Sequence, residues 1–363
     1  MNDSQPKDDA PTANLRIRSI RPISTPREVI TDLPCTCSEH VIASRRAVHD
    51  ILTGSSDRLI AVVGPCSIHD QKAAGEYAQR LAGLAKELAD DLLVIMRVYF
   101  EKPRTSIGWK GLINDPDIND TFAIDKGLRL ARSILLQINE LGLPCGTEML
   151  DVFTPQYFAD LLSWGAIGAR TTESQSHREL ASGLSFPVGF KNGTSGSVKV
   201  AVNAVHAARS SHHFLCITEK GESSIGETAG NEDTHIILRG GVAGPNYQPE
   251  SVGQAAAELT GANLPGNLIM IDCSHANSAK DYRNQPKVGE VIGAQIAGGD
   301  RNIIGIMIES NINEGNQSVA PLAELKYGVS ITDSCVGWED TEVMLRKLAG
   351  QVAARRRASQ PVS

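Results

Sequence analysis

From Leu59 onward the chain repeats one pattern: a short apolar run rich in β-branched residues, then polar or glycine-rich residues, then a helical stretch. This alternation is typical of parallel strands joined by helices, because each parallel connection must cross back over the sheet. The runs are LIAVVG from Leu59, LLVIMRV from Leu92, CGTEML from Cys145, AIGART from Ala166, PVGFKN from Pro187, HIILRG from His235, LIMID from Leu268 and IIGIMIES from Ile303. Their number predicts an α/β fold of the (β/α)₈ TIM barrel type, with an open doubly wound sheet as the alternative.

Helical periodicity is clearest between these runs, in KAAGEYAQRLAGLAKELA, DKGLRLARSILLQINELG and PQYFADLLSWG. The segment from Ser38 to Leu52 has apolar residues at the same spacing and is followed by Gly54, so we expect a helix there, before the main domain. Between Phe214 and Gly230 the chain alternates and turns instead. This pattern predicts a two-stranded β-hairpin, inserted before the sixth strand over about residues 212–232.

These elements divide the chain into four expected parts. Residues 1–14 are polar and should form a mobile tail, and 15–57 should form an N-terminal arm and helix. The catalytic barrel with its hairpin takes 58–355, and 356–363 form a C-terminal tail.

Composition narrows the class of protein. A chain of 363 residues with 41% hydrophobic content can bury a large core. Its net charge of -7 argues against a general nucleic-acid or membrane-surface binder, so any anionic ligand must meet a local concentration of Arg and Lys. The chain shows no secretory signal or membrane-spanning run, and its seven cysteines lack the spacing of a disulfide framework. We therefore expect a cytoplasmic protein with reduced thiols and no nucleic-acid or membrane partner.

Almost every predicted strand ends in a charged, thiol or imidazole-bearing segment. A buried strand has no structural use for such ends, whereas barrel enzymes build their active sites from the loops at the carboxyl ends of the strands. These ends are GPCS, MRVYFEKPRT, TEMLD, GARTTE, GFKNGT, ILRGG, DCSHANS and MIES. We therefore predict the active site at this rim.

Four side chains at this rim are metal-ligand types. Cys66, His275 and Glu309 end the first, seventh and eighth strands, which a closed barrel brings side by side, and Asp333 follows in the next loop. A thiolate, an imidazole and two carboxylates suit Mn, Fe, Co or Zn better than Ca or Mg. Each residue alone is more simply explained by packing or ion pairing, but their convergence favours one divalent metal ion. CTCSEH near the N-terminus lacks CxxC spacing, and we interpret it as structural.

Basic residues at the same strand ends predict anion binding. Several stand beside Gly or Thr, whose backbone and hydroxyl groups can approach phosphate oxygens closely. Solvated ion pairing is the alternative, but two anionic ligands explain so many cations better. The set comprises Arg97, Lys102, Arg104, Arg170, Lys191 and Arg239.

Together these segments resemble the type I 3-deoxy-D-arabino-heptulosonate 7-phosphate (DAHP) synthases, from about Leu15 to Arg355. The resemblance is carried by GPCSIHD, KPRTSIGWKG, GARTTESQ, GFKNGT, ILRGG, SHANS, ESNINEGNQ and ITDSCVGWEDT. It implies a metal-dependent transferase that joins phosphoenolpyruvate to erythrose 4-phosphate with water and releases phosphate. This aldol-type reaction opens the shikimate pathway to the aromatic amino acids.

The resemblance also implies roles for individual residues. Phosphoenolpyruvate is expected at Arg97, Glu148, Ala169, Arg170, Lys191 and Arg239, and erythrose 4-phosphate at Lys102, Arg104 and Thr105. The metal quartet carries over as Cys66, His275, Glu309 and Asp333. Cys66, His275 and Lys102 are the expected catalytic residues, with Lys102 as a candidate proton donor to the nascent alkoxide. Whether the metal polarises the aldehyde or positions a water stays open.

Synthases of this subgroup are often inhibited by Phe, Tyr or Trp in a pocket built partly from the inserted hairpin, and they assemble as dimers or tetramers. The matching effector positions are Asp151, Gln156, Leu184, Ser185, Phe214 and Cys216. Ordinary packing between hairpin and barrel is the alternative, above all for Leu184 and Phe214. Cys216 stands where relatives often have Ser or Gly, and Ala13 and Asn14 replace an acidic pair of some N-terminal arms, so the effector stays open.

Two other functions are compatible with a barrel of this kind. A 3-deoxy-octulosonate 8-phosphate synthase would use arabinose 5-phosphate, but that family has a different sequence at the KPRTSIGWKG loop. A non-catalytic sensor of aromatic amino acids would not need the intact metal quartet and cationic rim. Both are therefore disfavoured.

Overall fold

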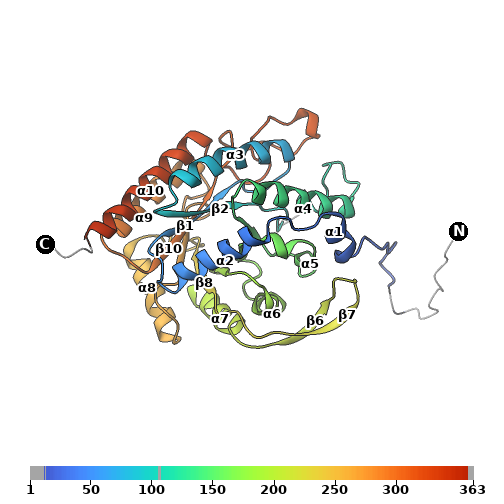
Figure 1. The fold of residues 1–363 in the computed structure, drawn as a ribbon, viewed down its shortest axis with the longest axis horizontal. Coiled ribbons are helices and arrows are strands. Elements are labelled where there is room, and N and C mark those ends of the chain that lie inside the picture. Colours follow the sequence, from blue (N-terminus) through green and yellow to red (C-terminus); the bar gives the residue numbers. More distant parts are fainter. Residues whose placement is uncertain (1–11, 13, 105–107, 359–363) are drawn as a thin grey trace.

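The computed structural model describes residue 12 and residues 14–104 and 108–358, which fold around one closed parallel barrel (Figure 1). The barrel strands are joined in the order β1-β10-β9-β8-β5-β4-β3-β2. Their bounds are β1 Leu59–Gly64, β2 Leu92–Arg97, β3 Cys145–Glu148, β4 Trp164–Ile167, β5 Val188–Lys191, β8 Thr234–Leu238, β9 Ile269–Asp272 and β10 Ile303–Glu309. The expected (β/α)₈ barrel is confirmed, and the open sheet is excluded.

The strands form because their residues are apolar and often β-branched, and all of them are buried. Helices surround them and bury one face each, as the amphipathic α4 does with Leu128, Leu135 and Ile138. The helices that follow the barrel strands are α3 Gln71–Glu87, α4 Ile124–Glu140, α5 Pro155–Phe158, α6 Gln175–Gly183, α7 Val198–Ala208, α8 Pro249–Gly261, α9 Gln285–Ala297 and α10 Trp338–Ala358. Short 3₁₀ turns are η1 Ala159–Leu161, η2 Tyr282–Asn284 and η3 Leu322–Glu324.

One helical expectation was too long. PQYFADLLSWG forms only α5 and the turn η1, and the fourth strand already begins at Trp164, two residues before the predicted Ala166. Leu161, Leu162 and Trp164 are all buried, whereas a helix on the outside of a barrel must expose one face. Pairing of Trp164 with Gly146 of β3 therefore replaces the last helical turns.

The expected N-terminal helix and hairpin are both present. α2 spans Ser38–Leu52, after a short α1 at Pro26–Asp32. The hairpin pairs β6 His213–Ile217 with β7 Ser223–Glu227 in antiparallel register. Figure 1 shows it beside α6, reaching toward α1. Its tip meets the arm directly, since the Arg27 backbone N–H donates to the Glu219 carbonyl at 2.7 Å.

α2 closes the end of the barrel at which the strands begin. Arg45 donates to the carbonyl of Leu162 at 2.8 Å, just before β4. His49 Nδ1 lies 2.7 Å from Asp233 Oδ1, just before β8. These contacts tie α2 to the residues just before β4 and β8, at the end of the barrel opposite the carboxyl ends of the strands.

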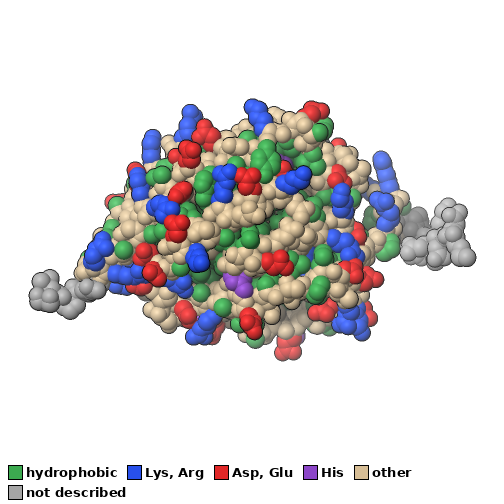
Figure 2. Space-filling view, turned by 45° about the horizontal axis from the view of Figure 1, so that its top comes forward, with side chains coloured by type: hydrophobic (Ala, Val, Ile, Leu, Met, Phe, Trp, Pro, Cys, Tyr) green, Lys and Arg blue, Asp and Glu red, His purple; other side chains and the backbone are tan. Residues whose placement is uncertain are grey.

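The surface carries charges of both signs. Figure 2 shows Lys and Arg side chains interspersed with Asp and Glu over the face in view. All seven cysteines are free thiols, as expected. Within the described ranges, no helix combines the length and apolar character needed to cross a bilayer. The expected tails at 1–14 and 356–363 fall largely outside the described residues.

Candidate active site

A cavity of about 560 Å³ opens at the carboxyl ends of the barrel strands. It gathers cationic side chains from distant parts of the sequence, which favours anionic ligands. The predicted substrate-binding residues along its wall are Arg97, Lys102, Arg104, Glu148, Ala169, Arg170, Lys191 and Arg239, and His275 and Asp333 line it as well. Thr105, the remaining predicted substrate-binding residue, lies outside the described residues.

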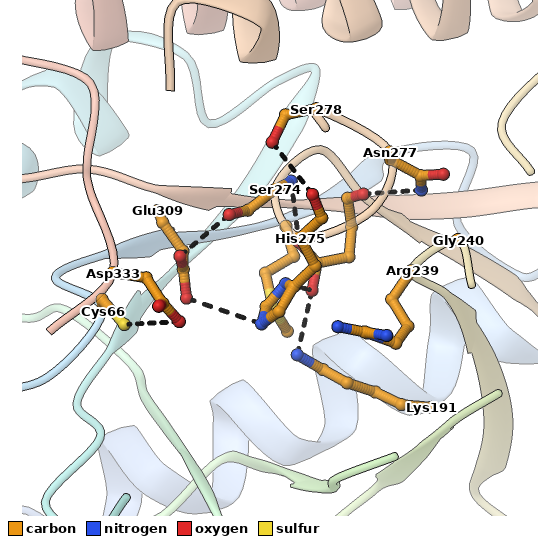
Figure 3. A network of polar contacts seen from close by, with 12 residues as sticks. Cys66, Lys191, Arg239, Gly240, Ser274, His275, Asn277, Ser278, Glu309 and Asp333 are labelled. Carbon is orange, nitrogen blue, oxygen red and sulfur yellow. Dashed lines mark hydrogen bonds and ion pairs between the residues drawn. The ribbon is translucent and has the colours of Figure 1, made fainter. Parts of the chain in front are cut away.

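Cys66, Glu309 and Asp333 form a compact group at one side of this cavity (Figure 3). One ligand-capable atom of each lies within 4.8 Å of those of the other two. His275 Nε2 lies 4.0 Å from Glu309 Oε1, so the fourth predicted ligand faces the same group. A thiol, two carboxylates and an imidazole are donors that Mn, Fe, Co or Zn accepts. The residues therefore fit a divalent metal ion, while their role as its ligands stays a prediction.

The strand register explains why the two ends of the barrel sequence meet here. Gly64, the last residue of β1, pairs with Glu309, the last residue of β10, and Cys66 follows two residues later. Gln285 fixes the Glu309 backbone by donating to its carbonyl at 2.9 Å and accepting from its N–H at 3.0 Å. The Glu309 carboxylate is therefore directed toward the cavity from a fixed backbone position.

His275 has a strained backbone. Its φ of 58° lies in the left-handed region, which costs a residue with a side chain on the order of 1 kcal/mol or more. Two groups of the following turn hold its carbonyl: the Lys280 N–H at 2.8 Å and the Ser278 hydroxyl at 3.3 Å. Strain held in this way is common where a side chain must point at a ligand.

Glu309 is ionised in spite of complete burial. Arg97 donates to its Oε1 at 2.8 Å and Ser274 to its Oε2 at 2.8 Å. Burial alone would raise the pKa of Glu309, but Arg97, His275 and Lys102 together lower it to about 2. The group therefore offers a fixed negative charge to any cation in the cavity.

Cys66 has the opposite tendency. Burial, and then the neighbouring Glu309, raise the pKa of the thiol to about 11, although Lys102 opposes this rise. Lys102 Nζ lies 3.0 Å from Cys66 Sγ. Such a thiol becomes a thiolate only beside additional positive charge, which a divalent cation would supply.

Arg97 is fully buried and bound on several sides. Besides Glu309, its guanidinium donates to the carbonyls of Pro65 and Cys66 at 3.1 and 3.3 Å. Its central carbon lies 3.4 Å from the ring centroid of Tyr99, a stacked cation–π contact. Burial would lower the pKa of Arg97, but Tyr99 and Glu309 raise it overall, so the group stays cationic. Arg97 therefore supports the metal group as well as the cavity wall.

Two loops of the predicted substrate site touch each other. Arg170, after β4, donates to the Pro103 carbonyl of the KPRT segment at 2.7 Å. Just before it, a Cβ placed on Gly168 would lie 2.1 Å from Glu148 Oε1. Only glycine therefore lets the Glu148 carboxylate occupy its place in the cavity wall.

Asp272 was missed from the sequence. It ends β9 and is fully buried, yet its Oδ2 lies 2.9 Å from Lys191 Nζ and 2.9 Å from His275 Nδ1. Burial would raise the pKa of Asp272, but His275 and Lys191 hold it well below the ordinary range. The available signal was an acidic residue that ends an apolar strand, the same signal that identified Glu309.

The predicted effector positions fall on separate elements. Leu184 and Ser185 follow α6 and line a second cavity of about 340 Å³, beside Arg45 and His49 of α2. Asp151 Oδ1 accepts from the Phe153 N–H at 2.6 Å and so caps the turn before α5. The other predicted positions, which do not line that second cavity, are Gln156 in α5 and Phe214 and Cys216 in β6.

The hairpin has two different faces. Phe214 and Cys216 are half-buried, and they alternate with the exposed Leu215. At its base, Thr228 Oγ1 lies 2.7 Å from Ser182 Oγ of α6. The face with Phe214 and Cys216 therefore belongs to the side near α6, while the assembly of all six positions into one pocket stays a prediction.

The fold and the cavity define a barrel enzyme of the (β/α)₈ class that gathers cations around a buried thiol and carboxylates. The model of the DAHP synthetase I family matches residues 33–346. A Phe-sensitive phospho-2-dehydro-3-deoxyheptonate aldolase of Escherichia coli is 55% identical over 345 residues, covering 94% of this chain and 98% of that protein. A Tyr-sensitive one from the same organism is 52% identical over 349 residues, covering 94% and 98%.

Among solved structures, a phospho-2-dehydro-3-deoxyheptonate aldolase from Francisella tularensis superposes with a TM-score of 0.91 at 51% identity, covering 94% of this chain and 99% of that one. The chain belongs to the DAHP synthetase I family. The synthase activity expected from the sequence is thereby confirmed at the level of the family.

Proposed function

We propose that this protein joins phosphoenolpyruvate to erythrose 4-phosphate with water, giving DAHP and phosphate at the mouth of the barrel. The cavity itself is the observation that carries this proposal. Arg170, Lys191 and Arg239 line this cavity, and so do Lys102 and Arg104. Two phosphate groups and a carboxylate can thus be matched by separate cations.

The chemistry requires charge to develop at two places. C3 of phosphoenolpyruvate bonds to the aldehyde carbon, whose oxygen gains a proton, while water adds at C2 and phosphate leaves as the ketone forms. Burial would lower the pKa of Lys102, but Cys66 and Glu309 raise it overall, so Lys102 remains an ammonium group. In this proposal Lys102 gives a proton to the nascent alkoxide, and Arg170, Lys191 and Arg239 orient phosphoenolpyruvate.

Cys66, His275, Glu309 and Asp333 would hold a divalent metal ion, Mn, Fe, Co or Zn, in this reaction. When bound, it supplies Lewis acidity toward an oxygen of a substrate or of water. The mixed thiol, imidazole and carboxylate donors support this assignment. Arg97 and Ser274, which both contact Glu309, keep the carboxylate aimed at the same point.

The activity is tested by mixing the protein and Mn²⁺ with phosphoenolpyruvate and measuring phosphate release with either aldose phosphate. We expect release with erythrose 4-phosphate. Release only with arabinose 5-phosphate would identify the octulosonate synthase reaction, and release with neither would favour the non-catalytic sensor. K191M should lose activity in the same assay, whereas K199M, in the outer helix α7, should keep it.

We also propose feedback inhibition by an aromatic amino acid near Asp151, Gln156, Leu184, Ser185, Phe214 and Cys216. The printed names of relatives as Phe-sensitive and Tyr-sensitive support this. Cys216 is the informative position, since a Cβ on Gly226, its diagonal neighbour on β7, would already lie 3.1 Å from its Sγ. C216G should enlarge that space and favour Tyr over Phe. Inhibition curves with Phe, Tyr and Trp on both proteins measure this, and an unchanged preference would remove Cys216 from the site.

A homodimer or homotetramer in the cytoplasm completes the proposal. Leu215 and Ile225, cross-strand partners on the outer face of the hairpin, are 84% and 75% exposed. In this proposal the N-terminal arm, residues 15–57, is a part of its own beside the barrel, residues 58–355. The arm adds the exposed Leu15 and Ile20. Exposed apolar side chains of this kind support contact with a second copy of the chain.

A further inference from the structure

Asp272 stands between the two functional halves of the cavity. Its Oδ2 lies 2.9 Å from Lys191 Nζ, a proposed phosphoenolpyruvate ligand, and 2.9 Å from His275 Nδ1, on a proposed metal ligand. Both contacts are made to the same oxygen. Figure 3 shows Lys191 approaching His275 from the side opposite to Cys66 and Asp333. One buried carboxylate oxygen therefore touches both halves.

The contact with His275 decides which ring nitrogen is free. Nδ1 is buried, and among the described residues no group makes a well-aligned hydrogen bond with it. Asp272 Oδ2, at 2.9 Å, is an acceptor close enough to take the proton of Nδ1 after a small rotation of the ring. A proton on Nδ1 leaves the lone pair on Nε2, the nitrogen that faces Glu309 at 4.0 Å. A carboxylate behind an imidazole orients the ring and makes it a better metal ligand.

The rest of Asp272 is fixed. Its Oδ1 accepts from the Ser274 N–H at 3.0 Å, and its carbonyl accepts from Asn277 Nδ2 at 2.8 Å. The side chain has no exposed surface and therefore no water with which to replace a lost partner. Its response to a ligand must be a redistribution between Lys191 and His275.

We propose that Asp272 is a positioning residue that couples divalent-cation binding at His275 to phosphoenolpyruvate binding at Lys191. This inference rests on the proposed function. Two donors to one oxygen weaken each other, because each reduces the negative charge that the other meets. A cation at Nε2 makes the Nδ1 proton a stronger donor, which loosens Asp272 from Lys191 and frees the ammonium for the phosphate. Phosphoenolpyruvate at Lys191 in turn leaves Asp272 to His275, so the coupling is positive and reciprocal.

The test measures the affinity for Mn²⁺ with and without phosphoenolpyruvate, and the affinity for phosphoenolpyruvate with and without Mn²⁺. In the unmodified protein each ligand should tighten the other by roughly tenfold or more. D272N keeps the side-chain size but removes the charge, and should reduce this factor at least about threefold. D300N is the matched control, since Asp300 accepts from the Asn302 N–H at 2.7 Å before β10, at the covered end of the barrel.

A second pair of variants covers the case in which D272N does not fold. K191M leaves Asp272 to His275 alone, so Mn²⁺ should bind more tightly without phosphoenolpyruvate. R239M removes another cation of the cavity that makes no hydrogen bond or ion pair with Asp272 among the described residues. If K191M and R239M changed the affinity for Mn²⁺ equally, or if D272N kept the full coupling, this inference would be overturned while the proposed function would stand. A protein that binds neither ligand would overturn the proposed function itself.

Discussion

The mouth of the barrel and the β6–β7 hairpin differ in the side chains that they present and in where those side chains find partners. At the mouth, Glu309, Asp272 and Arg97 are fully buried and paired with other charged groups of the same chain. On the hairpin, Leu215 and Ile225 are exposed and apolar. Buried charges need their partners within the chain, whereas exposed apolar side chains can find theirs on another copy. One chain therefore supplies the charged partners named at the mouth, whereas the exposed face of the hairpin is where we expect a second copy to make contact.

The largest effect on the mouth of the barrel is expected from the substitution E309Q. The amide cannot balance the buried Arg97 or offer the same negative charge to a cation, so we expect kcat/KM to fall roughly a thousandfold. Steady-state kinetics at saturating Mn²⁺ measure this. E324Q, on the exposed η3 turn, is the control and should match the unmodified protein. A loss below tenfold in E309Q would mean that the mouth tolerates an unpaired buried charge.

Glu101, which interacts with the predicted effector residue Asp151, gives the next largest effect. It is buried, and its Oε2 accepts from the Thr154 hydroxyl at 3.1 Å. Burial, and then the carboxylate of Asp151, raise its pKa from 4.5 to about 7. The folded protein therefore binds more protons than the unfolded chain between these values, and this contribution to stability is lost as the pH rises through 7.

E101Q should remove that loss, because the amide resembles the protonated acid. At pH 8 its free energy of unfolding should exceed that of the unmodified protein by up to about 3 kcal/mol, and at pH 4 the two should agree. Denaturant titrations at both pH values measure the difference. The same offset at pH 4 and pH 8 would contradict a raised pKa at Glu101.

The smallest expected effect concerns the hairpin. L215S combined with I225S removes apolar surface without touching the mouth, so we expect the proposed homodimer or homotetramer to dissociate roughly tenfold more readily while each chain keeps its activity at saturating substrate. Sensitivity to the aromatic effector should fall with dissociation. Sedimentation velocity measures the assembly, and I42S, at an exposed position of α2, is the control. An unchanged assembly would separate the hairpin from the subunit interface.

The sequence predicted the barrel and its rim because both depend on local patterns. A buried strand must be apolar over its whole length, and polar residues just after it can only lie at its end, as Glu309 and Cys66 do. The helix expected over PQYFADLLSWG was predicted too long. Leu161, Leu162 and Trp164 are buried, and apolar residues in such a short run fit a strand as well as a helix. Periodicity cannot separate these two for a short apolar run.

The pairings inside the cavity were not predictable in the same way. The contact of Lys191 with Asp272 joins β5 to β9, and the stacking of Arg97 on Tyr99 depends on the rotamers of two neighbouring residues. Such contacts follow from side-chain directions in the closed barrel rather than from spacing along the chain. The effector positions are harder still, because they lie on separate elements and only two of them, Leu184 and Ser185, line a common cavity.

The central claim, that one divalent ion is held by the mouth through Cys66, is tested most directly by cobalt spectroscopy. Co²⁺ bound to a thiolate gives a near-ultraviolet charge-transfer band that oxygen and nitrogen ligands do not give. We predict this band at one equivalent of Co²⁺ in the unmodified protein and in C335S, which removes the thiol 3.4 Å from the Cys66 backbone nitrogen. The band should be absent in C66S. A band that survives in C66S, or that never forms in the unmodified protein, would contradict the account.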